Sequence, residues 1–166
     1  MPELAEVEHA RALCHRLAVG RTVVDVDCAD DPIVVEGGHA AVEAALSGAR
    51  VVDTGRRGKH LWLALAEGPA LLLHLGMTGT LRTRGDEPLA LEGSPAETDR
   101  SWPPRFCKLR FTLDDGLEIA FTNARRLGRI RLRDDPAGTP PISDLGFDPL
   151  LDLPDVGVFA ALLSRR

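Results

Sequence analysis

The chain begins MPELAEVEHA, and its second and third residues could do chemistry together. If the initiator methionine is removed, Pro2 presents a free secondary amine beside the carboxyl group of Glu3. That arrangement places a nucleophile next to a group that can carry protons. A purely local explanation also exists, because proline is tolerated in the first turn of a helix and acidic residues suit the positive end of the helix dipole. These residues alone leave both interpretations open.

Three further motifs place reactive or unusual side chains at strand ends and turns. RRGKHLWL puts Lys59 at the start of a strand, and LLLHLGMTGTL puts Met77 in a turn flanked by glycines. TNARRLGRIRLR puts Arg125, Arg126 and Leu127 in another turn, with more arginines behind them. Each motif also has an ordinary explanation: a solvent-exposed lysine, a methionine in the core, or a run of arginines on the solvent-exposed face of a strand. Taken one at a time, the ordinary explanations are favoured.

A helix at the N-terminus would position the first of these motifs. Apolar residues recur near helical spacing from Leu4 to Leu17, and Gly20 follows them. This pattern predicts an amphipathic helix over residues 3–18.

Short strand-like runs separated by glycine and proline make up most of the remaining chain. They are TVVDVDC, RVVDTG, KHLWLAL, ALLLHL, GTLRTR, FCKLRFTL, LEIAFT and RIRLR. A DDG turn joins two of them as a hairpin, HAAVEAAL predicts a short helix, and the polar segment 85–104 predicts a long surface loop. The fold class is therefore α+β and mainly β: an antiparallel β-sandwich with an N-terminal helix and a short edge helix.

The end of the chain changes character. Residues 134–154 form a proline-rich connection, and PDVGVFAALLSRR begins a helix with Phe159, Leu162 and Leu163 on one side. We expect residues 1–150 to form one domain and residues 151–166 to begin a following helical domain.

Charge is distributed unevenly along the 166 residues, whose formal net charge is −5. Residues 49–133 contain 15 Lys or Arg and 10 Asp or Glu, a local balance of +5, whereas the segments on either side are acidic. Because a polyanion responds to the field near its binding site, a basic middle is compatible with nucleic acid.

The cysteines and the hydropathy pattern restrict the compartment and the metal chemistry. Cys14, Cys28 and Cys107 are odd in number, far apart and never in a C-x-x-C pair, which disfavours a disulfide framework and a zinc site. The sequence contains no apolar run that could span a bilayer and no signal-peptide pattern. We therefore expect a cytoplasmic protein without a membrane partner.

Together, the four motifs resemble the N-terminal domain of the formamidopyrimidine-DNA glycosylase / endonuclease VIII family. The order and spacing of MPELAEVE, RRGKHLWL, HLGMTGTL and TNARRLGRIRL carry the resemblance, which extends from Met1 to about Leu163. WPPRFCKLRFTLDDGLEIAFTNARRLGRIRL and PPISDLGFDPL are similar to the plant-like branch of that family. The N-terminal motif is highly specific, because its place at the chain terminus is part of the match.

The resemblance implies a reaction at the N-terminus. Pro2 would attack the sugar C1′ and displace a damaged base, giving a charged iminium that acts as an electron sink for elimination. Glu3 would protonate the sugar ring oxygen and shuttle protons. Lys59, which matches the lysine of the family's RR-x-K motif, would donate a proton or grip a phosphate near the lesion.

The resemblance also implies DNA-binding residues in the turns. An enzyme that acts on a base must flip it out of the duplex, and wedge side chains offset the cost by filling the space. Met77, Arg125 and Leu127 match the three wedge positions, and Arg125 would also hydrogen-bond the orphaned opposite base. Arg126 is the fourth expected DNA-binding residue.

Four positions depart from the family pattern. Ala5 replaces a proline, and Asn123-Ala124 replaces Asp-Pro, which we expect to loosen the turn before the two arginines. Leu127 replaces a phenylalanine, so the resemblance does not extend to the opposite-base preference.

The family's helix–two-turn–helix module and zinc finger would follow Arg166, so we expect no zinc or other cofactor in this chain. One hypothesis is an enzyme: a monomeric glycosylase and abasic-site lyase acting on double-stranded DNA that contains oxidised bases or abasic sites. A second is a weakly active binding module that lacks the second DNA-binding domain. A β-sandwich with no nucleic-acid role would require all four motifs to coincide by accident.

Overall fold

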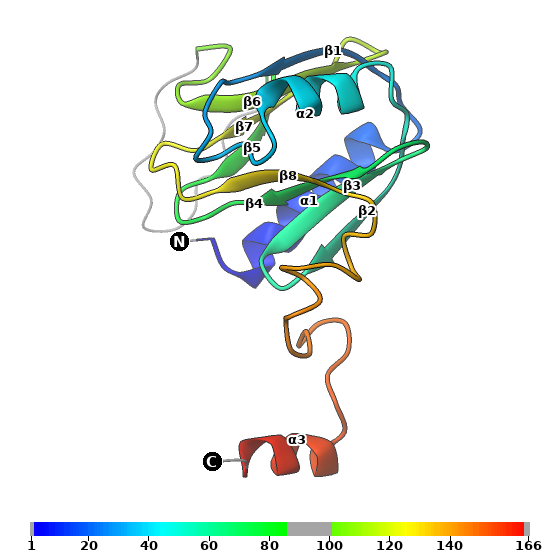
Figure 1. The fold of residues 1–166 in the computed structure, drawn as a ribbon, viewed down its shortest axis with the longest axis vertical. Helices are drawn as coiled ribbons and strands as arrows, with labels where there is room; N and C mark the ends of the chain where they lie inside the picture. The colour runs from blue at the N-terminus through cyan, green and yellow to red at the C-terminus, as the bar shows by residue number, and fades with distance from the viewer. Residues whose placement is uncertain (1, 86–100, 165–166) are drawn as a thin grey trace.

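The protein is a sandwich of two antiparallel four-stranded sheets (Figure 1). The computed structural model describes residues 2–85 and 101–164. One sheet has the order β1 (Val23–Cys28), β6 (Cys107–Leu113), β7 (Glu118–Thr122) and β5 (Thr80–Thr83). The other has the order β2 (Val51–Arg57), β3 (His60–Leu65), β4 (Ala70–His74) and β8 (Arg129–Arg133). The predicted sandwich is confirmed, and each predicted strand-like run forms one strand.

Two helices pack against the sandwich. α1 (Leu4–Ala18) lies against β2 and β3, and α2 (His39–Leu46) lies against β1. The buried residues of α1 recur at helical spacing: Val7, Ala10, Cys14 and Ala18. The predicted N-terminal helix and edge helix are therefore confirmed, with α1 beginning one residue later than expected.

Strand alternation determines which side chains enter the core. In β3, Leu61 and Leu63 are fully buried, whereas His60 and Trp62, which alternate with them, are only partly buried on the other face of the sheet. Burying one leucine side chain stabilises a fold by about 1.5–3 kcal/mol, so such rows hold the two sheets together. On the outer face the Trp62 ring covers Gly55, where a Cβ atom would lie only 2.1 Å from the ring.

The DDG turn between β6 and β7 has the expected form. Gly116 adopts φ 85°, in the left-handed region that favours glycine. The long surface loop predicted for residues 85–104 falls mostly on residues 86–100, which lie outside the described residues.

The segment after β8 passes along one edge of the sandwich and then leads away from it to α3 (Val156–Leu163) (Figure 1). Arg133 donates to the Pro140 carbonyl and Arg57 donates to the Gly146 carbonyl, so this segment is fastened to both edge strands of its sheet. α3 has no buried residue and lies apart from the sandwich (Figure 1). No helix among residues 2–85 and 101–164 is long and apolar enough to cross a bilayer.

Candidate active site

The N-terminal residues lie directly in front of α1. Glu3 is the N-cap of the helix and forms a capping box with Glu6, whose carboxylate accepts a hydrogen bond from the Glu3 backbone N–H. Glu3 is exposed, and Pro2 ahead of it is partly buried. Because the box fixes the first turn, the backbone of Pro2 and Glu3 is held at the end of a rigid helix.

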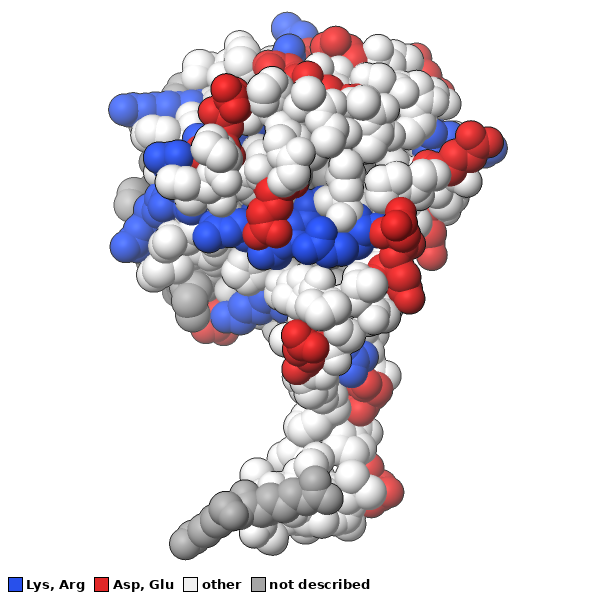
Figure 2. All heavy atoms as spheres, viewed as in Figure 1, with Lys and Arg blue, Asp and Glu red and all other residues white. Residues whose placement is uncertain are grey.

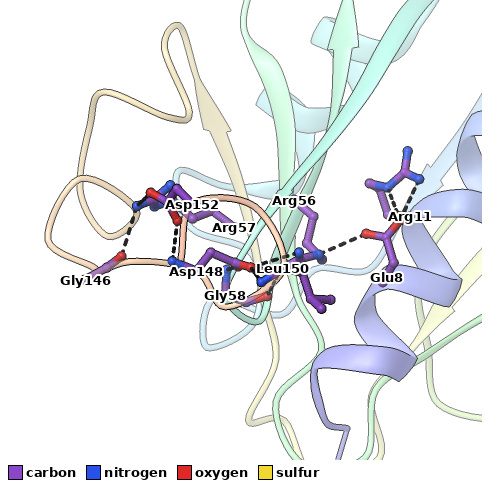
Figure 3. A network of polar contacts seen from close by, with 9 residues as sticks. All are labelled: Glu8, Arg11, Arg56, Arg57, Gly58, Gly146, Asp148, Leu150 and Asp152. Carbon is purple, nitrogen blue, oxygen red and sulfur yellow. Dashed lines mark hydrogen bonds and ion pairs between the residues drawn. The ribbon is translucent and has the colours of Figure 1, made fainter. Parts of the chain in front are cut away.

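A buried ion-pair network joins this helix to the turn that carries Lys59 (Figure 3). The Arg56 side chain is only 1% exposed and donates to Glu8 of α1 at 2.9 Å. It also donates to both carboxylate oxygens of Asp148, at 2.6 Å and 3.1 Å, and to the Gly58 carbonyl at 3.1 Å. Arg56 therefore connects α1, the β2–β3 turn and the segment after β8.

Asp148 holds that turn from the other side. Its carboxylate accepts the backbone N–H groups of Gly58 at 2.7 Å and Leu150 at 2.9 Å. The Arg56 guanidinium, together with these backbone donors, holds the pKa of Asp148 well below its usual range, against the opposing effect of burial. Since Gly58 is pinned, the backbone of the neighbouring Lys59 has a fixed position relative to α1.

Lys59 is partly exposed and forms no ion pair with any residue in the described ranges. The next residue, His60, lies opposite His74 of β4, with the two rings 4.7 Å apart. Burial lowers the pKa of His60 to about 4, and burial also lowers the pKa of His74, with nearby arginines and Lys59 adding to the effect. Both imidazoles are therefore neutral at pH 7.

The predicted wedge residues lie in two turns that are tied together. Met77 lies between β4 and β5 and is 39% exposed, and Leu127 lies between β7 and β8 and is 45% exposed. Asn123 is fully buried between the turns, where its amide donates to the Leu75 carbonyl at 3.0 Å and accepts the Gly128 N–H at 3.1 Å. The side-chain amide of Asn123 thus forms a hydrogen bond to each of the two turns. Contrary to our expectation, Asn123 does not loosen the turn before the two arginines.

Close backbone packing joins the same two turns. A Cβ atom at Gly76 would lie 2.5 Å from the Leu127 carbonyl carbon, and one at Gly128 would lie 2.8 Å from the His74 carbonyl oxygen. Only glycine fits at these two positions. The two turns that carry Met77 and Leu127 are therefore packed directly against each other, backbone to backbone.

The two arginines beside Leu127 have different environments. Arg125 is exposed and forms no ion pair with a described residue. Arg126 turns back and donates to both oxygens of Asp31, from Nε at 2.9 Å and from Nη2 at 2.8 Å. The role of Arg126 in DNA binding stays a prediction. Of the three guanidinium nitrogens, Nη1 is the one that does not take part in the pair with Asp31.

A row of neighbouring residues connects the Lys59 turn to the two wedge turns. His60, His74 and Arg129 are partners across β3, β4 and β8. The Gly76 N–H donates to His74 Nδ1 at 3.2 Å, and Arg129 donates to the Arg126 carbonyl at 3.3 Å. These contacts connect the Lys59 turn to the two wedge turns, and the Glu8–Arg56 pair connects the Lys59 turn to the helix that begins behind Pro2 and Glu3.

Basic side chains form a band across the face shown in Figure 2, interrupted by acidic residues. β8 alone carries three arginines: Arg129, Arg131 and Arg133. All three lie within 4 Å of one carboxylate, that of Glu36. The basic middle predicted from the sequence therefore includes a clustered excess of positive charge, which suits an anionic partner.

The described residues offer no metal site. Among them, no three His, Cys, Asp or Glu side chains are grouped closely enough to hold a metal ion. Cys14 and Cys28 are buried, and burial raises the pKa of each thiol to about 12, so neither is a thiolate at neutral pH.

Several residues of this region were missed by sequence reasoning. His60 and His74 lie inside the motifs quoted above, but nothing in the sequence distinguishes them from other strand residues. Asp148 and Asp31 have no local signal either, since each is recognisable only by the arginine that it meets in the fold.

Comparisons with known proteins point to a single family. Residues 1–130 match the family model for the formamidopyrimidine-DNA glycosylase N-terminal domain. A formamidopyrimidine-DNA glycosylase of Arabidopsis thaliana is 35% identical over 167 residues, covering 100% of this chain and 43% of the relative. One of Nocardioides sp. is 37% identical over 172 residues, covering 100% of this chain and 54% of the relative.

Solved structures show the same fold. The crystal structure of wild-type Lactococcus lactis Fpg with DNA containing N7-benzyl-Fapy-dG has a TM-score of 0.61 and 24% identity, and covers 79% of this chain and 43% of that one. The same enzyme bound non-covalently to DNA with an abasic site has a TM-score of 0.61 and 23% identity, covering 79% and 45%.

The family match and the shared fold therefore define a glycosylase-type β-sandwich domain. The chain belongs to the formamidopyrimidine-DNA glycosylase family and carries its N-terminal domain. It spans about half the length of the curated relatives that it matches, 43% of one and 54% of another.

Proposed function

We propose that the protein is the catalytic part of a DNA glycosylase with abasic-site lyase activity, which removes oxidised bases during base excision repair. The observation that carries the proposal is the joining of two predicted catalytic segments: the helix that begins behind Pro2 and the turn that carries Lys59 are fastened to each other through Glu8 and Arg56. A site that needs both segments in one place requires such a connection.

In the proposed reaction, the Pro2 nitrogen forms a bond to C1′ while the C1′–N bond to the damaged base breaks. The base leaves with the bonding electrons and takes up a proton, which balances the N–H proton that Pro2 loses when it becomes a tertiary amine. Glu3 gives a proton to the sugar ring oxygen, the ring opens, and the lone pair of the Pro2 nitrogen forms the iminium. Removal of a C2′ proton then expels the 3′ phosphate, and Lys59 contacts a phosphate or supplies a proton.

The wedge turns would supply the space-filling part of base flipping. Met77 and Leu127 are exposed apolar side chains on interlocked backbone, so they can enter a vacated stack with little rearrangement. Arg125, exposed beside them, would contact the unpaired opposite base.

Borohydride trapping tests the reaction. Protein with a free Pro2 amine should give a covalent adduct with abasic-site DNA after reduction, because borohydride reduces the iminium to a stable amine. Protein that retains Met1, or that is acetylated at Pro2, is the matched control and should give none. An equal yield of adduct from the blocked protein would exclude the terminal amine as nucleophile.

A second candidate function is a damage-binding module with weak activity of its own. The exposed apolar side chains of α3 and the segment before it favour this candidate, among them Leu150, Leu151, Phe159 and Leu163. For duplex DNA the salt slope of log K is about −0.9 per phosphate contact, so a domain with few contacts should show a shallow slope. Tight binding of lesion duplex with a steep slope would exclude this candidate.

A further inference from the structure

We propose that Asp31 is a positioning residue that fixes the Arg125–Leu127 turn in the orientation needed for entry into DNA. The inference rests on the proposed function, because it assigns a role to the support of the predicted wedge. Asp31 lies in the loop between β1 and α2, 95 residues before Arg126 in the sequence.

Asp31 is placed to act as a fixed anchor. It is 6% exposed, and its Oδ1 accepts the backbone N–H groups of Ile33 at 3.1 Å and Val34 at 3.3 Å. These local bonds set the direction of the carboxylate without any contribution from the wedge turn.

The anchor holds two cations. Arg126 binds it through two nitrogens, at 2.8 Å and 2.9 Å, and Lys108 of β6 donates to it at 2.8 Å. A two-pronged arginine–carboxylate pair fixes orientation as well as distance. These bonds keep the pKa of Asp31 well below its usual range, so the carboxylate is charged at neutral pH.

The backbone of Arg126 needs such support. Its φ is 56°, in the left-handed region that residues other than glycine rarely adopt. The neighbouring Arg125 and Leu127 leave the turn in directions that depend on this conformation. Holding the Arg126 side chain to Asp31 therefore holds the two side chains that would meet the DNA.

The loop that carries Asp31 is itself fastened to the strand that follows the turn. Ile130 of β8 donates to the Val34 carbonyl at 2.7 Å, and the Glu36 N–H donates to the Ile130 carbonyl at 3.0 Å. Arg131 then binds Glu36 through two bonds, at 2.6 Å and 2.7 Å. Asp31 thus fixes the turn relative to β8 and not merely to a free loop.

The test compares Asp31→Asn with Asp30→Asn in the full chain. Asp30 is the matched control because its side chain is 84% exposed and its ion-pair partner among the described residues is His39, at 3.3 Å. Two substrates are used: single-stranded abasic DNA, which leaves no hole to fill, and a duplex with 2-aminopurine opposite the abasic site. The fluorescence of 2-aminopurine rises when the base loses its stacking, so it reports entry of the wedge.

We expect Asp31→Asn to retain borohydride trapping on single-stranded DNA, to lose the 2-aminopurine signal, and to bind the duplex about 10-fold or more weakly, the change expected from losing a hydrogen bond between charged groups. Asp30→Asn should match the wild type in all three measurements. Arg126→Lys keeps the positive charge but cannot form the two-pronged pair with Asp31, so it should also lose the 2-aminopurine signal. It takes the place of Asp31→Asn in the test if that variant does not fold.

The outcomes distinguish a failure of the positioning role of Asp31 from a failure of the proposed function. An unchanged 2-aminopurine signal in a folded Asp31→Asn or Arg126→Lys protein would overturn the positioning role. Failure of the wild type itself to be trapped on single-stranded abasic DNA would instead refute the proposed function.

Discussion

Replacing Asp148 with asparagine should destabilise the protein severely. The side chains of Asp148 and Arg56 are each 1% exposed, so the change removes the negative charge from a buried pair without changing its size. Breaking a buried ion pair by removing one partner costs about 3–5 kcal/mol. Glu8, the other carboxylate on Arg56, is 37% exposed and cannot replace a buried counter-charge. Native proteins are stable by only about 5–15 kcal/mol, so this loss is a large fraction of the total.

The size of the effect can be measured by thermal unfolding. A chain of this length loses about 2–4 °C in Tm per kcal/mol, so Asp148→Asn should lower Tm by roughly 6–20 °C. Asp152→Asn is the matched control, because Asp152 also pairs with an arginine of the β2–β3 region but is 45% exposed. Its Tm should stay close to that of the wild type.

The difference between wild type and Asp148→Asn should also depend on pH. The pKa of Asp148 is lowered in the folded protein, so its contribution to stability is fully present above the pKa of an unfolded aspartate, about 3.9, and is lost as the pH falls through the folded pKa. Urea unfolding at pH 7 and at pH 3 should therefore show a smaller difference at pH 3. A difference in Tm of less than a few degrees at pH 7, or one that grows on acidification, would refute the assignment of Arg56–Asp148 as the buried support of the Lys59 turn.

Three further measurements test other parts of the site. Replacing Met77 or Arg125 with alanine should weaken binding to abasic duplex more than to single-stranded abasic DNA; equal losses in a binding titration would mean that these residues do not fill the duplex. Asn123→Asp should cost about 1–3 kcal/mol in urea unfolding, because a buried carboxylate oxygen then faces the Leu75 carbonyl without a donor; an unchanged midpoint would contradict this role of the amide. His60 should titrate by NMR with a midpoint near pH 4, because burial disfavours its charged form, and a midpoint near the usual 6.5 would contradict its burial.

Hydrophobic spacing was sufficient to predict the elements of the sandwich. HLWLAL alternates strictly, and β3 buries Leu61 and Leu63 accordingly. The run ALLLH shows no alternation, and β4 buries its first four residues, as expected for a strand covered on both faces. These patterns are local, so a single sequence contains them.

The supports of the site could not be predicted in the same way. Arg56 meets Asp148 across 92 residues of sequence, and no local pattern relates them. For Asn123 the local sequence led to a wrong prediction, because Asn123-Ala124 in place of the family's Asp-Pro suggested a loose turn. Its two partners are visible only after β4 and β8 lie side by side.

The glycines between the two wedge turns divide the site into positions that can change and positions that cannot. A side chain at Gly76 or Gly128 would collide with the backbone of the other turn, so a substitution there moves both turns at once. Met77, Arg125 and Leu127 project from the same turns into open solvent and can be exchanged without that penalty. Directed evolution toward a different opposite base should therefore randomise these three tips and keep both glycines constant, which confines the useful library to three codons.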